Sequence, residues 1–296
     1  MEQHYAPPNF QVSRKTSMNL RLSVLSSGSS GNATYMEADG TGLLVDAGLS
    51  CGRIRTLLAR IGRRLEDVEA VLITHGHSDH TSGVRSLVRE RGIAVYAAPG
   101  VGERLGAKLV EAWEPLRVGG LLAEFFEVPH DSRTYGVRVS GGGRIVALAT
   151  DLGEVSPEVL RRMRGAEAII LEANHDLEWL RRGPYSADLK RRVASANGHL
   201  SNKQAAEAAR DLAPHGLKDL VLAHLSKTNN SPSRATGTVT SALREAGHGR
   251  IRVRVALANH PTPWVEVGEP LESSEYAYRY EDGEAEGKAR QLFDIE

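Results

Sequence analysis

Short apolar runs, each bounded by turn-forming residues, recur along most of the chain. Leu20, Leu22 and Val24 alternate with polar residues, a pattern typical of a half-buried strand. Apolar runs predict further strands at 42–45, 71–73, 93–97, 124–128, 135–139, 145–149, 168–171, 220–223 and 251–256.

Helical spacing appears between these strands. Ser50 is a good N-cap for a helix with apolar residues at 54, 57, 58 and 61, and Gly62 would end it. Further helices are predicted at 84–91, 157–164 and 201–212, and the last begins with a capping box, Ser201 to Gln204. This order favours an α/β (α+β) fold, in which two sheets pack on each other under covering helices.

The hydrophobic pattern divides the chain into three parts. Residues 1–17 are expected to form a disordered leader, 18–267 one hydrolase-sized domain, and 268–296 a mobile acidic tail. No apolar run approaches the roughly 20 residues of a membrane span, and the first residues lack a secretory apolar core. The single cysteine, Cys51, excludes an intramolecular disulfide and is typical of a cytoplasmic protein.

Charge is unevenly distributed, although the formal net charge is zero. Residues 268–296 hold nine acidic and three basic residues, which leaves the body with a formal charge of +6. A basic body is compatible with an anionic substrate. Apolar residues return at 291–295, so the tail is either a solvated terminus, a docking peptide for a repair or replication protein, or a strap over the body.

The segment His75-Gly76-His77-Ser78-Asp79-His80 concentrates four candidate metal ligands directly after an apolar strand. Imidazole and carboxylate together suit Zn, Mn or Fe. His130, Asp151 and His224 each follow another apolar run closely. Strand ends lie on the rim of a rigid sheet, where distant segments can meet, so a shared metal site is expected.

Several separated motifs resemble one known family. HGHSDH has the form of the metallo-β-lactamase signature HxHxDH, and Leu44 to Gly48 is similar to the strand motif that precedes it. The segments 26–32, 172–176, 198–202 and 223–226 are similar, in order and wording, to the YycJ/WalJ group of that superfamily. The resemblance implies a four-layer αββα sandwich, two divalent metal ions (Zn or Mn, with Fe possible) and 5′-to-3′ exonuclease action, on DNA rather than RNA.

The resemblance also implies roles for individual residues. One metal ion would be held by His75, His77 and His130, the other by Asp79, His80 and His224, with Asp151 bridging both. Asp46 would orient a ligand histidine. Asp79 and His199 are the expected catalytic residues, and His199 would stand beside the scissile phosphate and protonate the leaving oxygen.

Substrate contacts are less sharply indicated. The loop 26–32, with Ser29, Ser30 and Asn32, is either a phosphate cradle or a tight turn, and Asn174 and His175 either line the pocket or form a structural turn. Two other functions stay open. One is hydrolysis of a small metabolite (a cyclic phosphate, thioester or lactone) by the same metal pair, and the other is metal-free DNA binding or scaffolding.

Overall fold

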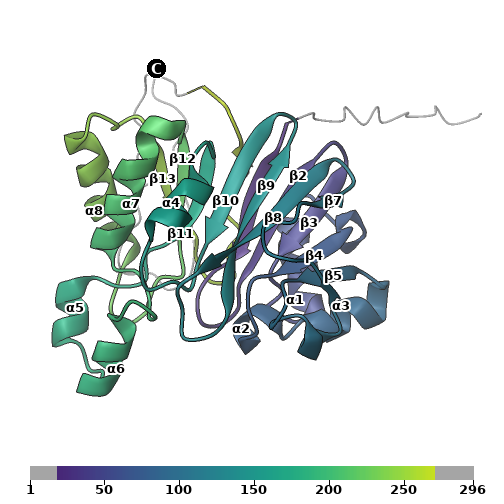
Figure 1. Cartoon of the computed structure of the whole chain (residues 1–296), viewed down its shortest axis with the longest axis horizontal. Helices are drawn as coiled ribbons and strands as arrows, with labels where there is room; N and C mark the ends of the chain where they lie inside the picture. The colour runs from purple at the N-terminus through teal and green to yellow at the C-terminus, as the bar shows by residue number, and fades with distance from the viewer. Residues whose placement is uncertain (1–18, 271–296) are drawn as a thin grey trace, which may run out of the picture.

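The computed structural model describes residues 19–270, so the expected leader and nearly all of the expected acidic tail lie outside the described residues. Two seven-stranded sheets form its centre (Figure 1). The first sheet has, in spatial order, β14 (Val265–Glu266), β1 (Arg21–Ser26), β2 (Ala33–Ala38), β3 (Thr41–Val45), β4 (Ala70–Ile73), β5 (Ala94–Ala97) and β6 (Lys108–Leu109).

The second sheet repeats the plan of the first. Its spatial order is β13 (Arg252–Val255), β12 (Asp219–Ala223), β11 (Ala168–Glu172), β10 (Arg144–Ala149), β9 (Thr134–Gly141), β8 (Leu121–Val128) and β7 (Leu116–Val118). In both sheets antiparallel strands come first along the chain, and β3 and β10 then begin the parallel part. The molecule therefore consists of two similar halves, although the sequence shows no repeat.

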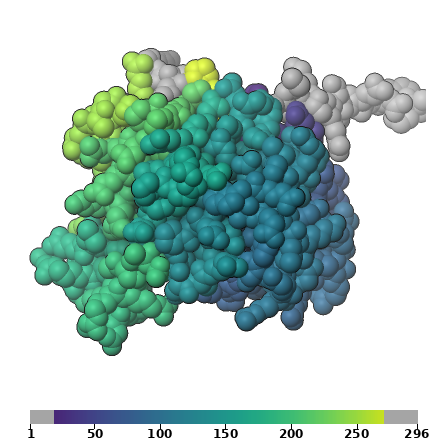
Figure 2. Space-filling model, in the orientation of Figure 1, coloured from purple at the N-terminus to yellow at the C-terminus, as the bar shows by residue number. Residues whose placement is uncertain are grey.

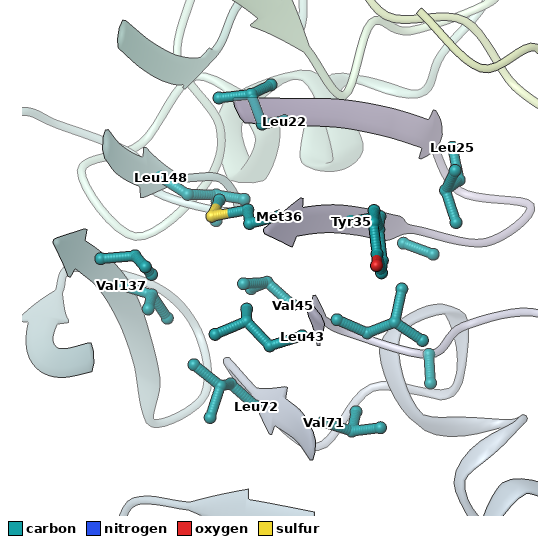
Figure 3. Close-up of a cluster of buried hydrophobic side chains, with 14 of the residues drawn as sticks. Leu22, Leu25, Tyr35, Met36, Leu43, Val45, Val71, Leu72, Val137 and Leu148 are labelled. Carbon is teal, nitrogen blue, oxygen red and sulfur yellow. The ribbon is translucent and has the colours of Figure 1, made fainter. Parts of the chain in front are cut away.

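The two sheets face each other across one hydrophobic core. Met36, Leu43 and Leu72 of the first sheet are fully buried, and so is Val137 of the second. Figure 3 shows Met36 and Leu72 directed toward Leu148 and Val137. Burial on both faces explains why the parallel strands are continuous apolar runs in the sequence rather than alternating ones.

Helices cover the outer face of each sheet, which gives the expected four layers (Figure 1). α1 (Cys51–Arg60) and α3 (Val84–Arg91) bury their apolar side chains against the first sheet. α4 (Pro157–Met163), α7 (Asn202–Leu212) and α8 (Pro232–Glu245) form a second core with the other sheet. Three short helices, α2 (Ser78–Thr81), α5 (Leu177–Arg182) and α6 (Ala187–Val193), lie at the lower end of the molecule in Figure 1.

The predicted elements are confirmed to within a few residues, including both capping predictions. The Ser50 side chain accepts a hydrogen bond from the N–H of Arg53, and Ser201 and Gln204 form the capping box. The sequence pattern did not predict β2, α8 or the pair α5–α6. α8 is rich in Ser, Thr and Gly, so tertiary burial of Ala235, Val239 and Leu243, rather than propensity, makes it helical. Among the described residues, no helix is both long and apolar enough to cross a bilayer.

Candidate metal centre

The segment 74–80, here called the metal loop, runs from the end of β4 into α2 and carries four of the predicted ligands, and Asp46 holds it in place. Thr74 donates its backbone N–H to Asp46 Oδ1 over 2.9 Å and its hydroxyl to Asp46 Oδ2 over 2.9 Å. His80 donates its Nδ1–H to Asp46 Oδ2 over 2.7 Å, which leaves its Nε2 facing the interior of the site. The buried Asp46 carboxylate thus fixes both ends of the loop, as expected for a residue that orients a ligand histidine.

Close backbone packing positions Asp79. The N–H of Asn32 donates to the Asp79 carbonyl over 2.8 Å, and the N–H of Gly48 donates to the Asn32 carbonyl over 2.9 Å. A Cβ atom on Gly48 would overlap the Asp79 carbonyl. Glycine is therefore required at position 48, because the loop lies directly on the backbone that follows β3.

Three other strand ends converge on this loop from the second sheet. His130 follows β8, Asp151 follows β10 and His224 follows β12 directly. Asp151 and His224 have positive φ angles of 58° and 57°, and Asp46 has 63°. Asp and His tolerate this left-handed region better than most residues, and such strained positions concentrate at functional sites.

The seven predicted ligands lie together. Ligand atoms within 4.8 Å of one another form four overlapping sets. Three contain predicted ligands alone: His75, His77 and His130; His75, His80 and Asp151; Asp79, His80 and His224. The fourth joins Asp151 and His224 to Glu172 and His199. His80 Nε2 lies 3.1 Å from Asp151 Oδ2 and 3.6 Å from Asp79 Oδ2. Asp151 is therefore between the two groups of histidines, where the resemblance places a bridging ligand.

The chemistry of the site fits divalent metal ions. His75 Nε2, Asp151 Oδ2 and His224 Nε2 are buried and have no hydrogen-bond partner. A buried polar atom without a partner costs about 1–3 kcal/mol, so three such atoms aimed at one region point to a ligand. Imidazole and carboxylate donors suit Zn, Mn or Fe.

The charges of the site would favour cations. Burial lowers the pKa of His75 to about 2, so its imidazole is neutral and free to bind a metal. Burial alone would raise the pKa of Asp151, but His224 and His80 outweigh it and hold that pKa well below its usual range. Burial likewise opposes protonation of His80, whereas Asp46 and Asp151 raise its pKa. A bound cation would take the place of these protons.

Glu172, the last residue of β11, contacts two histidines of the site, although the sequence pattern gives it no role. Its side chain is fully buried, and Oε1 accepts hydrogen bonds from the Nδ1–H groups of His199 and His224, each over 2.8 Å. Oε2 accepts from the backbone N–H groups of Leu152 over 3.0 Å and Leu200 over 3.4 Å. Both carboxylate oxygens are thus occupied, which makes Glu172 a support for the two histidines. A carboxylate ending an apolar strand was the available signal.

His199 lies between two predicted ligands, with its ring centroid 5.3 Å from that of His130 and 5.2 Å from that of His224. Its side chain keeps 23% of its exposure. Burial lowers its pKa, but Glu172 and Asp151 outweigh burial and raise that pKa to about 9. In the metal-free chain this pKa favours a protonated imidazole near neutral pH, and the side chain is reachable from solvent.

The residues expected to contact substrate differ in their exposure and in their contacts with the site. Ser29 and Ser30 are exposed on their loop. Asn32 is buried, and its Nδ2 lies 2.9 Å from His80 Nε2 and 3.2 Å from the Gly28 carbonyl. It therefore borders the group of predicted ligands that contains His80 and His224. Asn174 donates to the carbonyl of His224 over 2.8 Å. His175 is buried, and burial lowers its pKa to about 4.

Comparison with known proteins identifies the family. The model of the beta-lactamase superfamily domain matches residues 41–225. Exodeoxyribonuclease WalJ of Streptococcus pneumoniae is 39% identical over 245 residues, which cover 78% of this chain and 91% of that protein. Exodeoxyribonuclease YycJ of Bacillus anthracis is 36% identical over 243 residues, 78% of this chain and 92% of that protein.

Solved structures agree on the fold. The metallo-beta-lactamase fold protein YhfI of Bacillus subtilis superposes with a TM-score of 0.64 at 17% identity, covering 83% of this chain and 99% of that one. Zn(2+)-bound PqqB of Methylobacterium extorquens gives a TM-score of 0.61 at 18% identity, covering 82% and 99%. The chain belongs to the beta-lactamase superfamily and, within it, to the group that contains the WalJ and YycJ proteins.

Proposed function

We propose that this protein is a two-metal phosphodiester hydrolase that removes nucleotides from DNA in the 5′-to-3′ direction. The observation that carries the proposal is the position of His199, hydrogen-bonded to Glu172 and set between the two groups of predicted metal ligands. Relatives named exodeoxyribonucleases, matched over almost their whole length, support DNA as the substrate.

The predicted ligands fall into two groups, one for each metal ion. His75, His77 and His130 would hold one ion, Asp79, His80 and His224 the other, and Asp151 would contact both. When bound, two divalent ions such as Zn or Mn supply Lewis acidity that activates water and neutralises charge on the phosphate. Asp79 keeps 22% of its side-chain exposure, so it stands at the boundary between the cluster and solvent, where the substrate enters.

Proton transfer to the leaving oxygen is assigned to His199. Glu172 accepts the Nδ1–H of His199, so the ring is held with its Nε2 available to donate. A positioned general acid typically contributes about 10²–10⁴ in rate. Glu172 also accepts the Nδ1–H of His224, so one carboxylate aligns the acid with a predicted ligand.

A comparison of substrate classes tests the proposal. Purified protein loaded with Mn or Zn should degrade 5′-labelled DNA to short labelled products at once, whereas 3′-labelled DNA should lose its label last. It should hydrolyse bis(p-nitrophenyl) phosphate and leave a lactoyl thioester intact. Thioester turnover without DNA turnover would establish the small-metabolite alternative instead, and elemental analysis that finds no metal in active protein would refute the mechanism.

We also propose that the acidic tail docks a repair or replication protein, and that the protein is cytoplasmic. Truncation after Gly268 should abolish capture of such a partner without altering the intrinsic rate. Faster cleavage by the truncated chain would instead identify the tail as an inhibitory strap over the basic body.

A further inference from the structure

The pair α5–α6, residues 177–193 and here called the arm, projects beyond the body of the molecule (Figures 1 and 2). The arm begins five residues after Glu172 and ends six residues before His199. Because Glu172 and His199 are hydrogen-bonded to each other, both ends of the arm are anchored at the candidate metal centre.

The end of α6 packs directly on the residues of the site. His199 donates its backbone N–H to the Val193 carbonyl over 2.9 Å, and the Gly198 carbonyl accepts from His130 Nδ1 over 3.1 Å. A Cβ atom on Gly198 would overlap the carbonyls of Arg192 and Val193. The arm therefore has a fixed position at the edge of the site rather than at a distance from it.

The surface of the arm combines cations with exposed apolar side chains. Leu177 and Trp179 are 49% and 36% exposed, and they are two of the five large apolar side chains that are exposed among the described residues. The arm contains two acidic residues, Glu178 and Asp188, and five basic ones: Arg181, Arg182, Lys190, Arg191 and Arg192. The Arg234 guanidinium lies 4.6 Å from the centre of the Trp179 ring and so holds the ring in one orientation.

The cations of the arm differ in how strongly they are already paired. Arg182 pairs with Glu178 over 2.8 Å, and Arg191 pairs with Asp188. Arg192 lies 3.8 Å from an Asp131 carboxylate oxygen. Among the residues that the structure describes, no carboxylate pairs with Lys190 or Arg181, but Lys190 is half-buried and donates to the Arg181 carbonyl over 2.9 Å, whereas the Arg181 side chain is exposed. Arg181 is therefore the arm cation most available to an external anion.

We propose that the arm binds single-stranded DNA next to the end that is being cut. One base would stack on Trp179, and the phosphate of a neighbouring nucleotide would pair with Arg181, which is two residues further on and so leaves α5 on another side. This inference rests on the proposed nuclease function. An indole ring beside cations is the combination by which proteins hold unpaired strands, since every unpaired base offers a face for stacking. A duplex hides those faces and presents only phosphates and groove edges.

Binding of a fluorescent single-stranded oligonucleotide of about 12 nucleotides tests the proposal. It should carry phosphorothioate linkages and be titrated into the full, metal-loaded chain. Trp179→Ala should weaken binding about 5- to 100-fold, and Trp179→Phe, which keeps a ring, should weaken it less. Arg181→Ala should reduce the slope of log affinity against log salt by about 0.7. The affinity for duplex DNA of equal length should change little in Trp179→Ala.

Two matched controls separate the arm from general effects. Trp113 is also partly exposed, at 38%, and carries the Arg162 guanidinium 3.6 Å from its ring centre, but it lies outside the arm. Arg210 is exposed near the end of α7, about 12 Å along that helix from its start beside the site. Trp113→Phe and Arg210→Ala should bind DNA as the wild type does. Bound metal and the thermal midpoint, measured for every variant, establish that each is folded.

The outcomes distinguish the arm from the nuclease itself. Wild-type protein that hydrolyses bis(p-nitrophenyl) phosphate but neither binds nor degrades DNA would refute the proposed function, and the arm proposal with it. Wild-type protein that degrades DNA, with folded arm variants of unchanged affinity and KM, would overturn the arm proposal alone and leave that surface to a protein partner. If Trp179→Ala fails to fold, Trp179→Phe and Arg181→Ala decide the question.

Discussion

Replacement of Glu172 by glutamine probes the support beneath the candidate metal centre with a nearly isosteric change. Oε1 accepts from two imidazole N–H groups and Oε2 from two backbone N–H groups. A glutamine offers one oxygen and one NH2 group, so in either orientation an NH2 group faces a pair of donors. The substitution therefore removes hydrogen bonds without leaving a cavity.

Each orientation has a calculable cost. If the NH2 group faces the backbone, the N–H groups of Leu152 and Leu200 lose their acceptor, at about 1–3 kcal/mol for each buried group. If it faces the imidazoles, His199 and His224 must accept at Nδ1 and carry their proton on Nε2. A protonated Nε2 is unable to bind a metal, and loss of such a support typically costs 10- to 100-fold in metal affinity or activity. We expect Glu172→Gln to bind metal about 10- to 100-fold more weakly.

Chelator competition with Zn or Mn measures that affinity, and thermal unfolding in excess chelator measures the stability of the metal-free chain. Each kcal/mol lost should lower the midpoint by about 2–4 °C for a domain of this size. Glu167→Gln is the matched control, because Glu167 precedes the opposite end of β11 and pairs with Arg144 over 2.9 Å and Lys218 over 3.1 Å. Equal metal affinity and equal midpoints for wild type and Glu172→Gln would refute this reasoning.

Four further predictions follow from the site and the fold. His199→Ala should keep both metals and lose roughly 10²–10⁴ in kcat, whereas loss of metal would show that it is a ligand. Asp151→Ala should abolish turnover and reduce bound metal in elemental analysis, because two cations would be less well neutralised. Gly48→Ala should lower the thermal midpoint and the metal content, since its Cβ overlaps the metal-loop backbone. Burial opposes ionisation of Glu37, but hydrogen bonds from Arg63 and Arg21 lower the pKa of its carboxyl group in the folded chain. The ionised carboxylate therefore stabilises the fold fully above the usual pKa of 4.5, and this stabilisation is lost as pH falls through the lower pKa of the folded chain. Glu37→Gln should accordingly make the free energy of unfolding, measured by denaturant titration, depend less on pH in that acidic range.

The site residues that the sequence predicts are those that lie within one short motif or next to an apolar run. His75 to His80 form one continuous motif, and Asp151 and His224 stand next to apolar runs whose ends the hydrophobic pattern locates. Glu172 is not among the predicted site residues because the apolar run before it ends at Leu171, which places the carboxylate outside the predicted strand. Its partners, His199 and His224, lie 27 and 52 residues away, and no local pattern reports a hydrogen bond between such distant positions.

The sequence pattern does not predict the arm, for a different reason. Its helices have six and seven residues and are separated by the four residues 183–186, which begin with Gly183-Pro184, so neither helix is long enough to show a helical period. Its exposed Leu177 and Trp179 also contradict the rule that apolar residues mark the buried face of an element. Local patterns detect elements that pack on the core, and the arm does not pack in that way.

The two similar halves explain why the site requires the whole sandwich. Asp46 follows β3 in the first half, and Asp151 follows β10 in the second, each with a left-handed backbone at the start of the parallel part of its sheet. His80 lies between them, with Nδ1 2.7 Å from Asp46 and Nε2 3.1 Å from Asp151. The same position in the two halves thus supports a histidine in one case and belongs to the candidate metal ligands in the other. Because the candidate ligands come from both sheets, metal binding must hold the sheets in register, and the packing of the core in turn fixes the distances between the ligands.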